Sequence, residues 1–210
     1  GLDGGMAEYM VVRDADRHLV ALPDTLTPDL AAPLTDAGVT PYHAIKRSLV
    51  KLADPRSTVL VIGVGGLGGF GVQILSALTS ARIVVVDTRD EARARAVEDG
   101  AQHTFAPGDD TASHLRDLTG GRGVDVVLDF VGNRATLDLA GAVVRPLGDL
   151  TVVGAGGANA TVGFGVLPYE VSVQTTFWGN RTELAEVIDL AARGIIRPRV
   201  AHYPLSEALT

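Results

Sequence analysis

The sequence predicts a doubly wound α/β fold built on a six-stranded parallel sheet. From residue 59 onward, short runs rich in valine, isoleucine and leucine alternate with longer segments of helical periodicity. Such alternation is typical of parallel strands joined by crossover helices. Hydrophobic residues make up 46% of the 210 residues and charged residues 20%, so we expect a packed core and not a disordered chain.

The expected strands are short β-branched segments bounded by glycine or polar residues. They cover residues 59–62, 83–86, 103–105, 124–128, 150–153 and 171–177. The expected helices cover residues 67–78, 90–98, 110–118, 135–144 and 182–192, with Asn133 as a cap and Gly194 as a terminator. The last strand, 171–177, could lie at an edge of the sheet, and open edges pair readily with other chains.

The segments outside this alternation suggest a second domain. Residues 1–35 carry a strand-like run at 7–12 and a proline-punctuated stretch, so we expect the remnant of a separate domain and its connection. Residues 36–195 are expected to form the α/β domain, entered through a helical connection at 35–52. Residues 196–210 are expected to begin the return to the separate domain, with a helix starting near 204. Because the chain starts at Gly1 without a methionine, we expect both ends to be cut from a longer polypeptide.

A glycine-rich turn follows the first strand of the alternation. It fits the pattern G-x-G-x-x-G and includes Gly63, Gly65, Gly66, Leu67 and Gly68. The first glycine permits a tight turn, the second lets a pyrophosphate approach the backbone, and the third lets the helix pack closely on the strand. The free N–H groups at the start of the helix would then bind the anion. The motif is weak alone, but its place between strand and helix predicts a dinucleotide-binding Rossmann domain.

Asp87 ends the second strand, 19 positions after Gly68. A carboxylate at this position can accept hydrogen bonds from the adenosine ribose hydroxyls, and it would repel the additional phosphate of NADP. The alternative is a cap for the helix that begins near Asp90. Arg89 weakens the preference for NAD, because a nearby arginine can accommodate a 2′-phosphate. We expect NAD as the cofactor.

Other features narrow the class of protein. The net charge of −7 gives no electrostatic reason to expect nucleic acid or an anionic membrane as a partner. No apolar run approaches the length of a membrane span, and a cytoplasmic location is the default expectation. A second glycine run, 154–157, follows a strand without a clear helix after it, so we expect backbone near the nicotinamide end of the cofactor and not a second phosphate site.

The chain resembles the zinc-dependent medium-chain alcohol dehydrogenases, and more narrowly the actinobacterial NAD-dependent secondary-alcohol dehydrogenases. The resemblance extends over nearly the whole chain and is carried by residues 6–10, 33–38, 40–47, 63–68, 128–132 and 177–179. It implies that residues 1–35 come from a mostly-β, GroES-like catalytic domain. It also implies a small-molecule alcohol or ketone as the substrate, and a homo-oligomer, either a dimer or a tetramer, joined through the sheet edge.

The resemblance gives Asp36 a catalytic role as a ligand of the catalytic zinc. Without it, Asp36 would more often be a helix cap or a turn residue. A catalytic zinc needs about three protein ligands and an open position, and the other ligands of the family lie upstream of Gly1. We therefore expect this chain to bind cofactor better than it turns over alcohol, and to hold zinc weakly, so zinc belongs to the complete enzyme.

The resemblance also assigns residues around the nicotinamide. Thr40 would face its ring, Phe130 and Val131 would line the cofactor, and Gly154 and Ala155 would meet its nicotinamide side. Phe177 and Trp178 would border the carboxamide and the substrate pocket. Core packing is the alternative for Phe130, Val131 and Trp178, while His43 is expected to be structural.

The function expected is NAD-dependent, zinc-assisted interconversion of secondary alcohols and ketones or aldehydes, with this chain supplying the cofactor domain. One alternative is a zinc-free quinone or enoyl reductase that uses NADPH. Another is a non-catalytic NAD-binding module that senses the redox ratio. Asp36 and Asp87 argue against the zinc-free reductase.

Overall fold

A computed structural model describes residues 7–207 of the chain. Its centre is a six-stranded, all-parallel sheet with the order β3-β2-β1-β4-β5-β6. The strands are β1 (Thr58–Ile62), β2 (Arg82–Val86), β3 (His103–Phe105), β4 (Val124–Asp129), β5 (Val144–Val152) and β6 (Ser172–Thr175). The predicted fold class is confirmed, and the sheet ends at β6 as expected.

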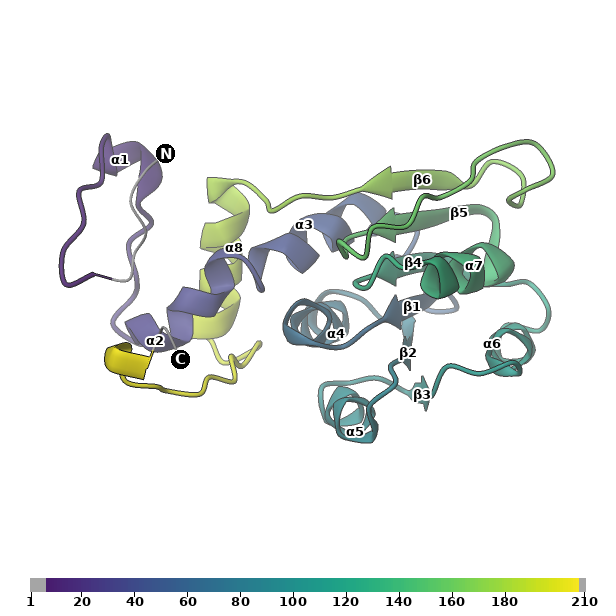
Figure 1. Ribbon diagram of the computed structural model, residues 1–210, viewed down its shortest axis with the longest axis horizontal. Helices are drawn as coiled ribbons and strands as arrows, with labels where there is room; N and C mark the ends of the chain where they lie inside the picture. The colour runs from purple at the N-terminus through teal and green to yellow at the C-terminus, as the bar shows by residue number, and fades with distance from the viewer. Residues whose placement is uncertain (1–6, 208–210) are drawn as a thin grey trace.

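Helices cover both faces of the sheet (Figure 1). One face carries α3 (Val39–Ser48), α4 (Gly66–Leu78) and α5 (Asp90–Glu98), and α8 (Arg181–Ala192) packs against α3 beyond the sheet; the other face carries α6 (Thr111–Leu118) and α7 (Arg134–Val143). Asn133 and Asn180 each close a capping box, at α7 and α8. The predicted cap at Asn133 is confirmed, and Gly194 (φ +69°) follows α8 as predicted.

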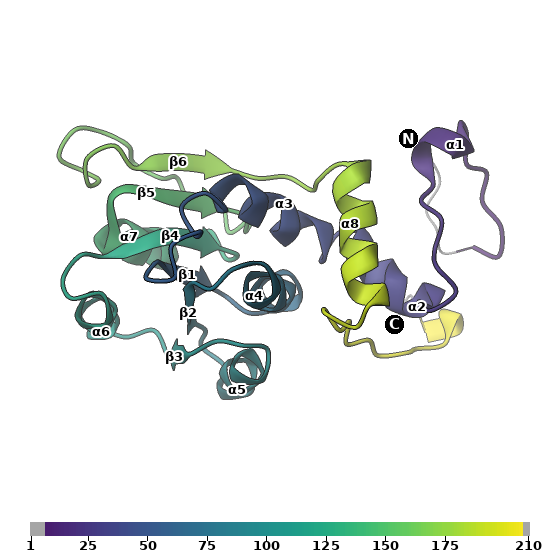
Figure 2. The same cartoon turned by 180° about the vertical axis from the view of Figure 1, so that it is seen from behind.

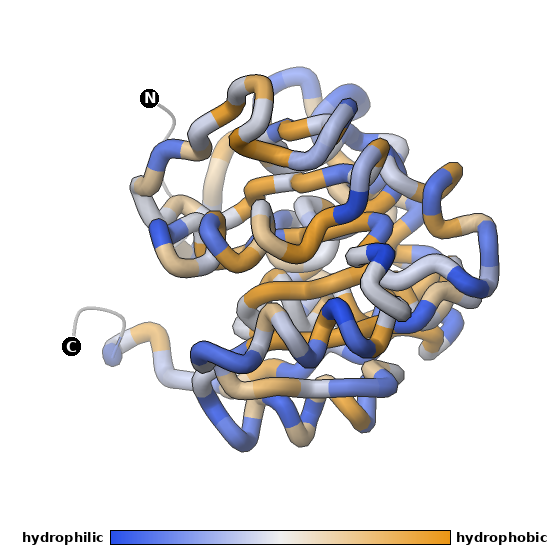
Figure 3. The backbone as a smooth tube through the Cα atoms, turned by 90° about the vertical axis from the view of Figure 1, so that its right-hand side faces the viewer, coloured by the Kyte–Doolittle hydropathy of each residue, from blue (hydrophilic) through white to orange (hydrophobic). Residues whose placement is uncertain are grey.

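The strands separate two hydrophobic cores. Val59 and Val61 pack into the core under α4 and α5, whereas Leu60 and Ile62 pack into the core under α6 and α7. Side chains of a strand point alternately to the two faces of a sheet, so a central strand buried on both faces must be apolar throughout. Figure 3 shows the hydrophobic strands inside and hydrophilic segments around them.

The segment before the sheet differs from the prediction. Residues 7–12 form no strand, because within the described residues no strand lies beside them to accept their hydrogen bonds. Instead the chain makes α1 (Ala15–His18), α2 (Pro28–Ala31) and the 3₁₀ helix η1 (Ala32–Thr35). These elements lie beyond α8, away from the sheet (Figure 2).

Two boundaries also differ. β5 starts at Val144, directly after α7, and not at residue 150. β6 is shorter than the predicted 171–177. Of the helix expected from residue 204, the structure shows the 3₁₀ helix η2 (Leu205–Glu207), and residues 208–210 lie outside the described residues. No helix in the 7–207 region is long and apolar enough to cross a membrane.

Candidate cofactor-binding site

The glycine turn joins β1 to α4, and the geometry requires glycine at two of the predicted positions, Gly63 and Gly68. Gly63 has φ +81°, a conformation that strongly favours glycine. A Cβ on Gly68 would lie 1.9 Å from the carbonyl oxygen of Gly63, so only glycine lets α4 approach β1 this closely. A Cβ on Gly66 would meet nothing within 4 Å, which leaves open space beside the backbone at the start of α4.

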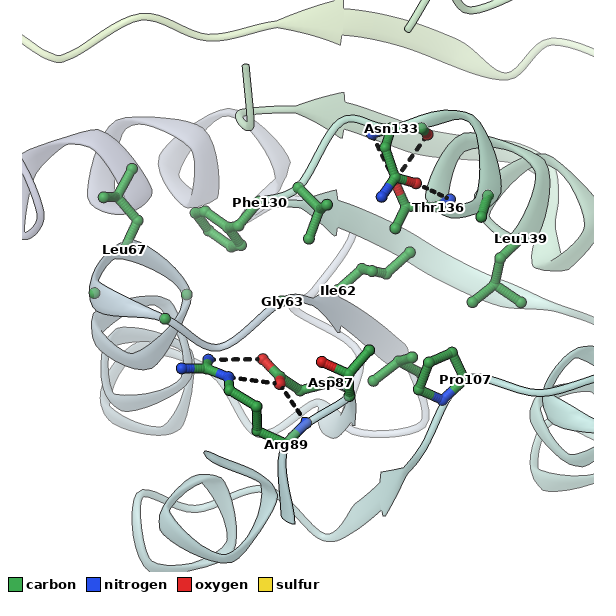
Figure 4. Close-up of a pocket in the computed structure, with 17 residues that line it drawn as sticks. Ile62, Gly63, Leu67, Asp87, Arg89, Pro107, Phe130, Asn133, Thr136 and Leu139 are labelled. Carbon is green, nitrogen blue, oxygen red and sulfur yellow. Dashed lines mark hydrogen bonds and ion pairs between the residues drawn. The ribbon is translucent and has the colours of Figure 1, made fainter. Parts of the chain in front are cut away.

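Asp87 lies at the carboxyl end of β2 and is 7% exposed. Its carboxylate accepts hydrogen bonds from the backbone N–H groups of Val64, at 2.8 Å, and Arg89, at 2.9 Å. The Arg89 guanidinium pairs with both carboxylate oxygens, with Nε–Oδ1 at 3.2 Å and Nη2–Oδ2 at 3.1 Å (Figure 4). Asp87 therefore holds the glycine turn in place, and α5 has no side-chain cap of the kind considered from the sequence.

The charge of Asp87 is stabilised although the residue is buried. Burial alone raises the pKa of Asp87, but hydrogen bonds from the Arg89 guanidinium and from the N–H groups of Arg89 and Val64 lower the pKa below its ordinary value of 3.8. The carboxylate is thus ionised at neutral pH and can accept hydrogen bonds from a diol.

A groove of about 610 Å³ lies above the glycine turn, at the carboxyl ends of β1, β2 and β4. The chain reverses its direction across the sheet between β1 and β4, and ligands of doubly wound sheets bind at such a switch point. The groove brings together nine residues predicted from the sequence: Gly63, Gly65, Gly66, Leu67, Gly68, Asp87, Arg89, Phe130 and Val131.

The opposite wall of the groove was not predicted as part of the site. It includes Pro107 after β3 and the first turns of α7, with Asn133, Ala135, Thr136 and Leu139. Buried Asp129 organises this wall, because it accepts hydrogen bonds from the N–H groups of Val131 and Gly132 and from the Thr136 hydroxyl. The strand order could have predicted this wall. Because β4 ends at the same edge of the sheet as β1, the helix after β4 starts beside the glycine turn.

Six predicted residues do not line this groove: Asp36, Thr40, Gly154, Ala155, Phe177 and Trp178. Gly154 lies directly behind it, since a Cβ there would be 2.3–2.5 Å from backbone atoms of Phe130 and Val131. Phe177 and Trp178 stack on each other at 4.8 Å and are 80% and 56% exposed. The roles suggested for these six residues remain predictions.

Asp36 and Thr40 lie together at the start of α3. The buried Thr40 hydroxyl donates to Oδ1 of the exposed Asp36 at 3.0 Å, and no side chain caps α3. Across residues 7–207, no group of three or more His, Cys, Asp or Glu side chains could hold a metal ion. One carboxylate does not make a zinc site, so the donor set present here does not fit a catalytic zinc.

His43 lies outside the groove and joins two helices. Its Nδ1 lies 2.9 Å from the buried Glu183 carboxylate, which also accepts the N–H of Asn180 at the start of α8. His43 therefore ties α3 to the cap of α8, and it does not line the groove.

Comparison with known proteins decides the family. The family described as zinc-binding dehydrogenase matches residues 66–193, which is more than half of the chain. The chain belongs to the zinc-binding dehydrogenase family. This confirms the resemblance to the medium-chain alcohol dehydrogenases.

Among the relatives of this zinc-binding dehydrogenase chain is an NAD-dependent alcohol dehydrogenase of Sulfolobus acidocaldarius, 35% identical over 95% of the chain and 57% of the relative. A D-arabinose 1-dehydrogenase (NADP(+)) of Saccharolobus solfataricus is 33% identical over 98% of the chain and 59% of the relative. Among solved structures, the alcohol dehydrogenase of Aeropyrum pernix has a TM-score of 0.82 at 34% identity, covering 90% of this chain and 56% of that one. The chain thus spans somewhat more than half the length of these relatives.

Proposed function

We propose that the chain forms the NAD(H)-binding domain of an alcohol dehydrogenase. The observation that carries this proposal is the ionised Asp87 at the rim of the groove above the glycine turn. The acetophenone reductase of Geotrichum candidum, solved in complex with NAD, supports it with a TM-score of 0.76 at 31% identity, covering 90% of this chain and 52% of that one.

The residues of the groove fit NAD chemically. The first N–H groups of α4 have no acceptor within the helix and would bind the pyrophosphate. Asp87 would accept the hydroxyl groups of the adenosine ribose, and the apolar side chains of Ile62, Leu139 and Val131 would pack against uncharged rings. NAD supplies a hydride acceptor when bound, and the chain's own contribution is to bind and orient it.

The nicotinamide side of the proposal rests on the family. Thr40 would face the ring, Gly154 and Ala155 would lie on its other side, and Phe177 and Trp178 would border the carboxamide and the substrate. Asp36 would be one ligand of a zinc ion in the complete enzyme. Within residues 7–207 no group of three or more His, Cys, Asp or Glu side chains that could hold a metal ion includes Asp36, so these residues do not complete a zinc site.

The substrate we propose is a secondary alcohol or the matching ketone, with aldehydes as further products of the same hydride transfer. We also propose a homo-oligomer that pairs through the edge strand β6, whose outer side has no neighbouring strand within residues 7–207. Division of the chain at residues 35 and 195 and a cytoplasmic location remain predictions.

The test is NADH formation from NAD and 2-propanol by the gene product that contains this chain, supplied with zinc. The expected result is turnover that Asp36→Ala reduces by at least about 100-fold, since loss of a metal ligand or its support costs about that much. Asp189→Asn serves as a control, since Asp189 is exposed, pairs with Arg193 at the end of α8 and does not line the groove. Turnover with NADPH and an enone, but not with the alcohol, would instead establish the zinc-free reductase.

A further inference from the structure

A second pocket lies behind the glycine turn, between α4 and α5. It has a volume of about 240 Å³ and is bounded by the backbone of Gly65 and Gly66 on one side. Four arginines line it: Arg89, Arg95, Arg197 and Arg199. Asp99 is the acidic residue among its lining residues, so the pocket is strongly positive in a chain whose net charge is −7.

Two of the four arginines are neutralised and two are not. Arg199 makes a bidentate pair with Asp99, at 2.8 Å for both contacts, and Arg89 pairs with Asp87. Arg95 has no acidic partner within residues 7–207, and Arg197 uses its Nε only for a 3.4 Å contact to the carbonyl oxygen of Gly194. Two guanidinium groups therefore remain available to an anion.

A buried side chain adds another donor. Gln73 on α4 is 8% exposed, and its Oε1 accepts the backbone N–H of Arg197 at 2.7 Å. That bond fixes the orientation of the amide, and the Gln73 NH₂ group makes no hydrogen bond within residues 7–207, so it can donate to a ligand in the pocket. Planar guanidinium forks and amide N–H groups are the donors that recognise phosphate oxygens.

Arg89 connects this pocket to the cofactor groove, because it lines both. Its guanidinium donates hydrogen bonds to both carboxylate oxygens of Asp87 (Figure 4). These are the oxygens that would accept hydrogen bonds from a ribose. Its side chain is 56% exposed and lies beside Gly65, 4.0 Å from where a Cβ would be, so it can turn toward the second pocket.

We propose that the arginine pocket binds a phosphate dianion, and that its occupation draws Arg89 away from Asp87 and strengthens NAD(H) binding. The coupling rests on the proposed NAD(H) site. By thermodynamic linkage, NAD(H) must then strengthen phosphate binding by the same factor. The phosphate group could be free in solution or carried on the 2′ position of NADP(H), and the two sources give different results below.

The first experiment titrates inorganic phosphate into the cofactor-free chain by calorimetry, in chloride buffer of constant ionic strength. The expected result is saturable binding that the double variant Arg95→Gln/Arg197→Gln weakens at least about tenfold, because each guanidinium lost removes charge-assisted hydrogen bonds to the phosphate oxygens. Arg193→Gln is the matched control, since Arg193 pairs with Asp189 and lies outside the pocket. Unchanged thermal unfolding shows that the variants are folded.

The second experiment measures NADH and NADPH affinity with and without phosphate. If the pocket binds free phosphate, NADH should bind at least threefold more tightly in the presence of phosphate. This effect should be lost in Arg89→Gln and in the double variant. If the pocket binds the 2′-phosphate of NADP(H), the wild-type chain should bind NADPH, and free phosphate should inhibit this binding. The double variant should then lose NADPH binding but keep NADH binding.

If neither phosphate nor NADPH binds, or if the double variant binds them as tightly as the wild-type chain, the proposal that the arginine pocket binds phosphate is wrong. Phosphate binding that leaves NADH affinity unchanged would overturn the coupling. Intact phosphate binding with no NADH binding would overturn the proposed function instead, so the two failures are distinguishable.

Discussion

Asp87 is the residue on which cofactor recognition depends most. It is buried and ionised, and it joins the glycine turn to the end of β2 through Val64 and Arg89. The same two carboxylate oxygens stabilise the glycine turn and would accept hydrogen bonds from the proposed ligand. This double use explains why the position needs an acid and why its geometry is fixed before a ligand arrives.

Replacing Asp87 by asparagine keeps one acceptor and removes the charge. We expect the Kd for NADH to rise about 10- to 100-fold, because hydrogen bonds to a charged group contribute about 1.5–3 kcal/mol. Fluorescence titration of NADH measures this. Asp138→Asn is the control, since Asp138 is exposed and pairs with Arg134 on the surface of α7. An unchanged Kd in Asp87→Asn would contradict the assignment.

At the residue scale, the sequence predicted the site residues whose positions follow from the order of strands and turns. Gly63, Gly68 and Asp87 follow from the order strand, glycine turn, helix, strand, acid. The pairing of Arg89 with Asp87 and the contribution of Pro107 could not be predicted, because they depend on side-chain rotamers and on loops that meet only in space.

At the scale of elements, the packing of α4 against β1 depends on Gly68. Gly68→Ala places a methyl group on the Gly63 carbonyl, so we expect the free energy of unfolding to fall by about 1–3 kcal/mol or more and NADH binding to weaken. Gly69→Ala is the matched control: its Cβ meets nothing within 4 Å, and helix propensity predicts stabilisation by about 0.4–1 kcal/mol. Urea denaturation measures both, and equal effects would contradict the packing argument.

The contact between α3 and α8 predicts an alkaline transition. Burial raises the pKa of Tyr42 to about 12, helped by its hydrogen bond to Glu186. A raised pKa means that this contribution to stability is present below pH 10 and is lost as the pH rises toward 12. In an absorbance titration of the four tyrosines, one should ionise late, and Tyr42→Phe should remove that late step. Ionisation of all tyrosines together near pH 10 would contradict this.

Elements with a strong periodic pattern were predicted closely, and those that depend on neighbours were not. The predicted helix 90–98 and strand 103–105 match α5 and β3. The early start of β5 was hidden by Pro146 and by Leu147, whose φ is +64°, and the pairing with β4 shifts register there. The run 7–12 has β propensity but no neighbouring strand within the described residues, and an unpaired strand is not stable.

At the scale of the whole molecule, the described residues form the groove above the glycine turn but do not supply the donors of a zinc site. Asp36 is one carboxylate, whereas a catalytic zinc takes about three protein ligands. We expect that the 210-residue chain, loaded with zinc and dialysed against a chelator, retains far less than one zinc per chain by atomic absorption. Stoichiometric retention would contradict this account of the donor set.

The most direct test of the account is hydrogen–deuterium exchange of the chain with and without saturating NADH. Cofactor bound in the groove predicts slower exchange at the glycine turn and the start of α4 (62–69), at 87–89 and at 130–139, because these segments line it. Exchange in α6 serves as the internal reference. Protection confined to other segments, or no protection at any NADH concentration, would contradict the cofactor site.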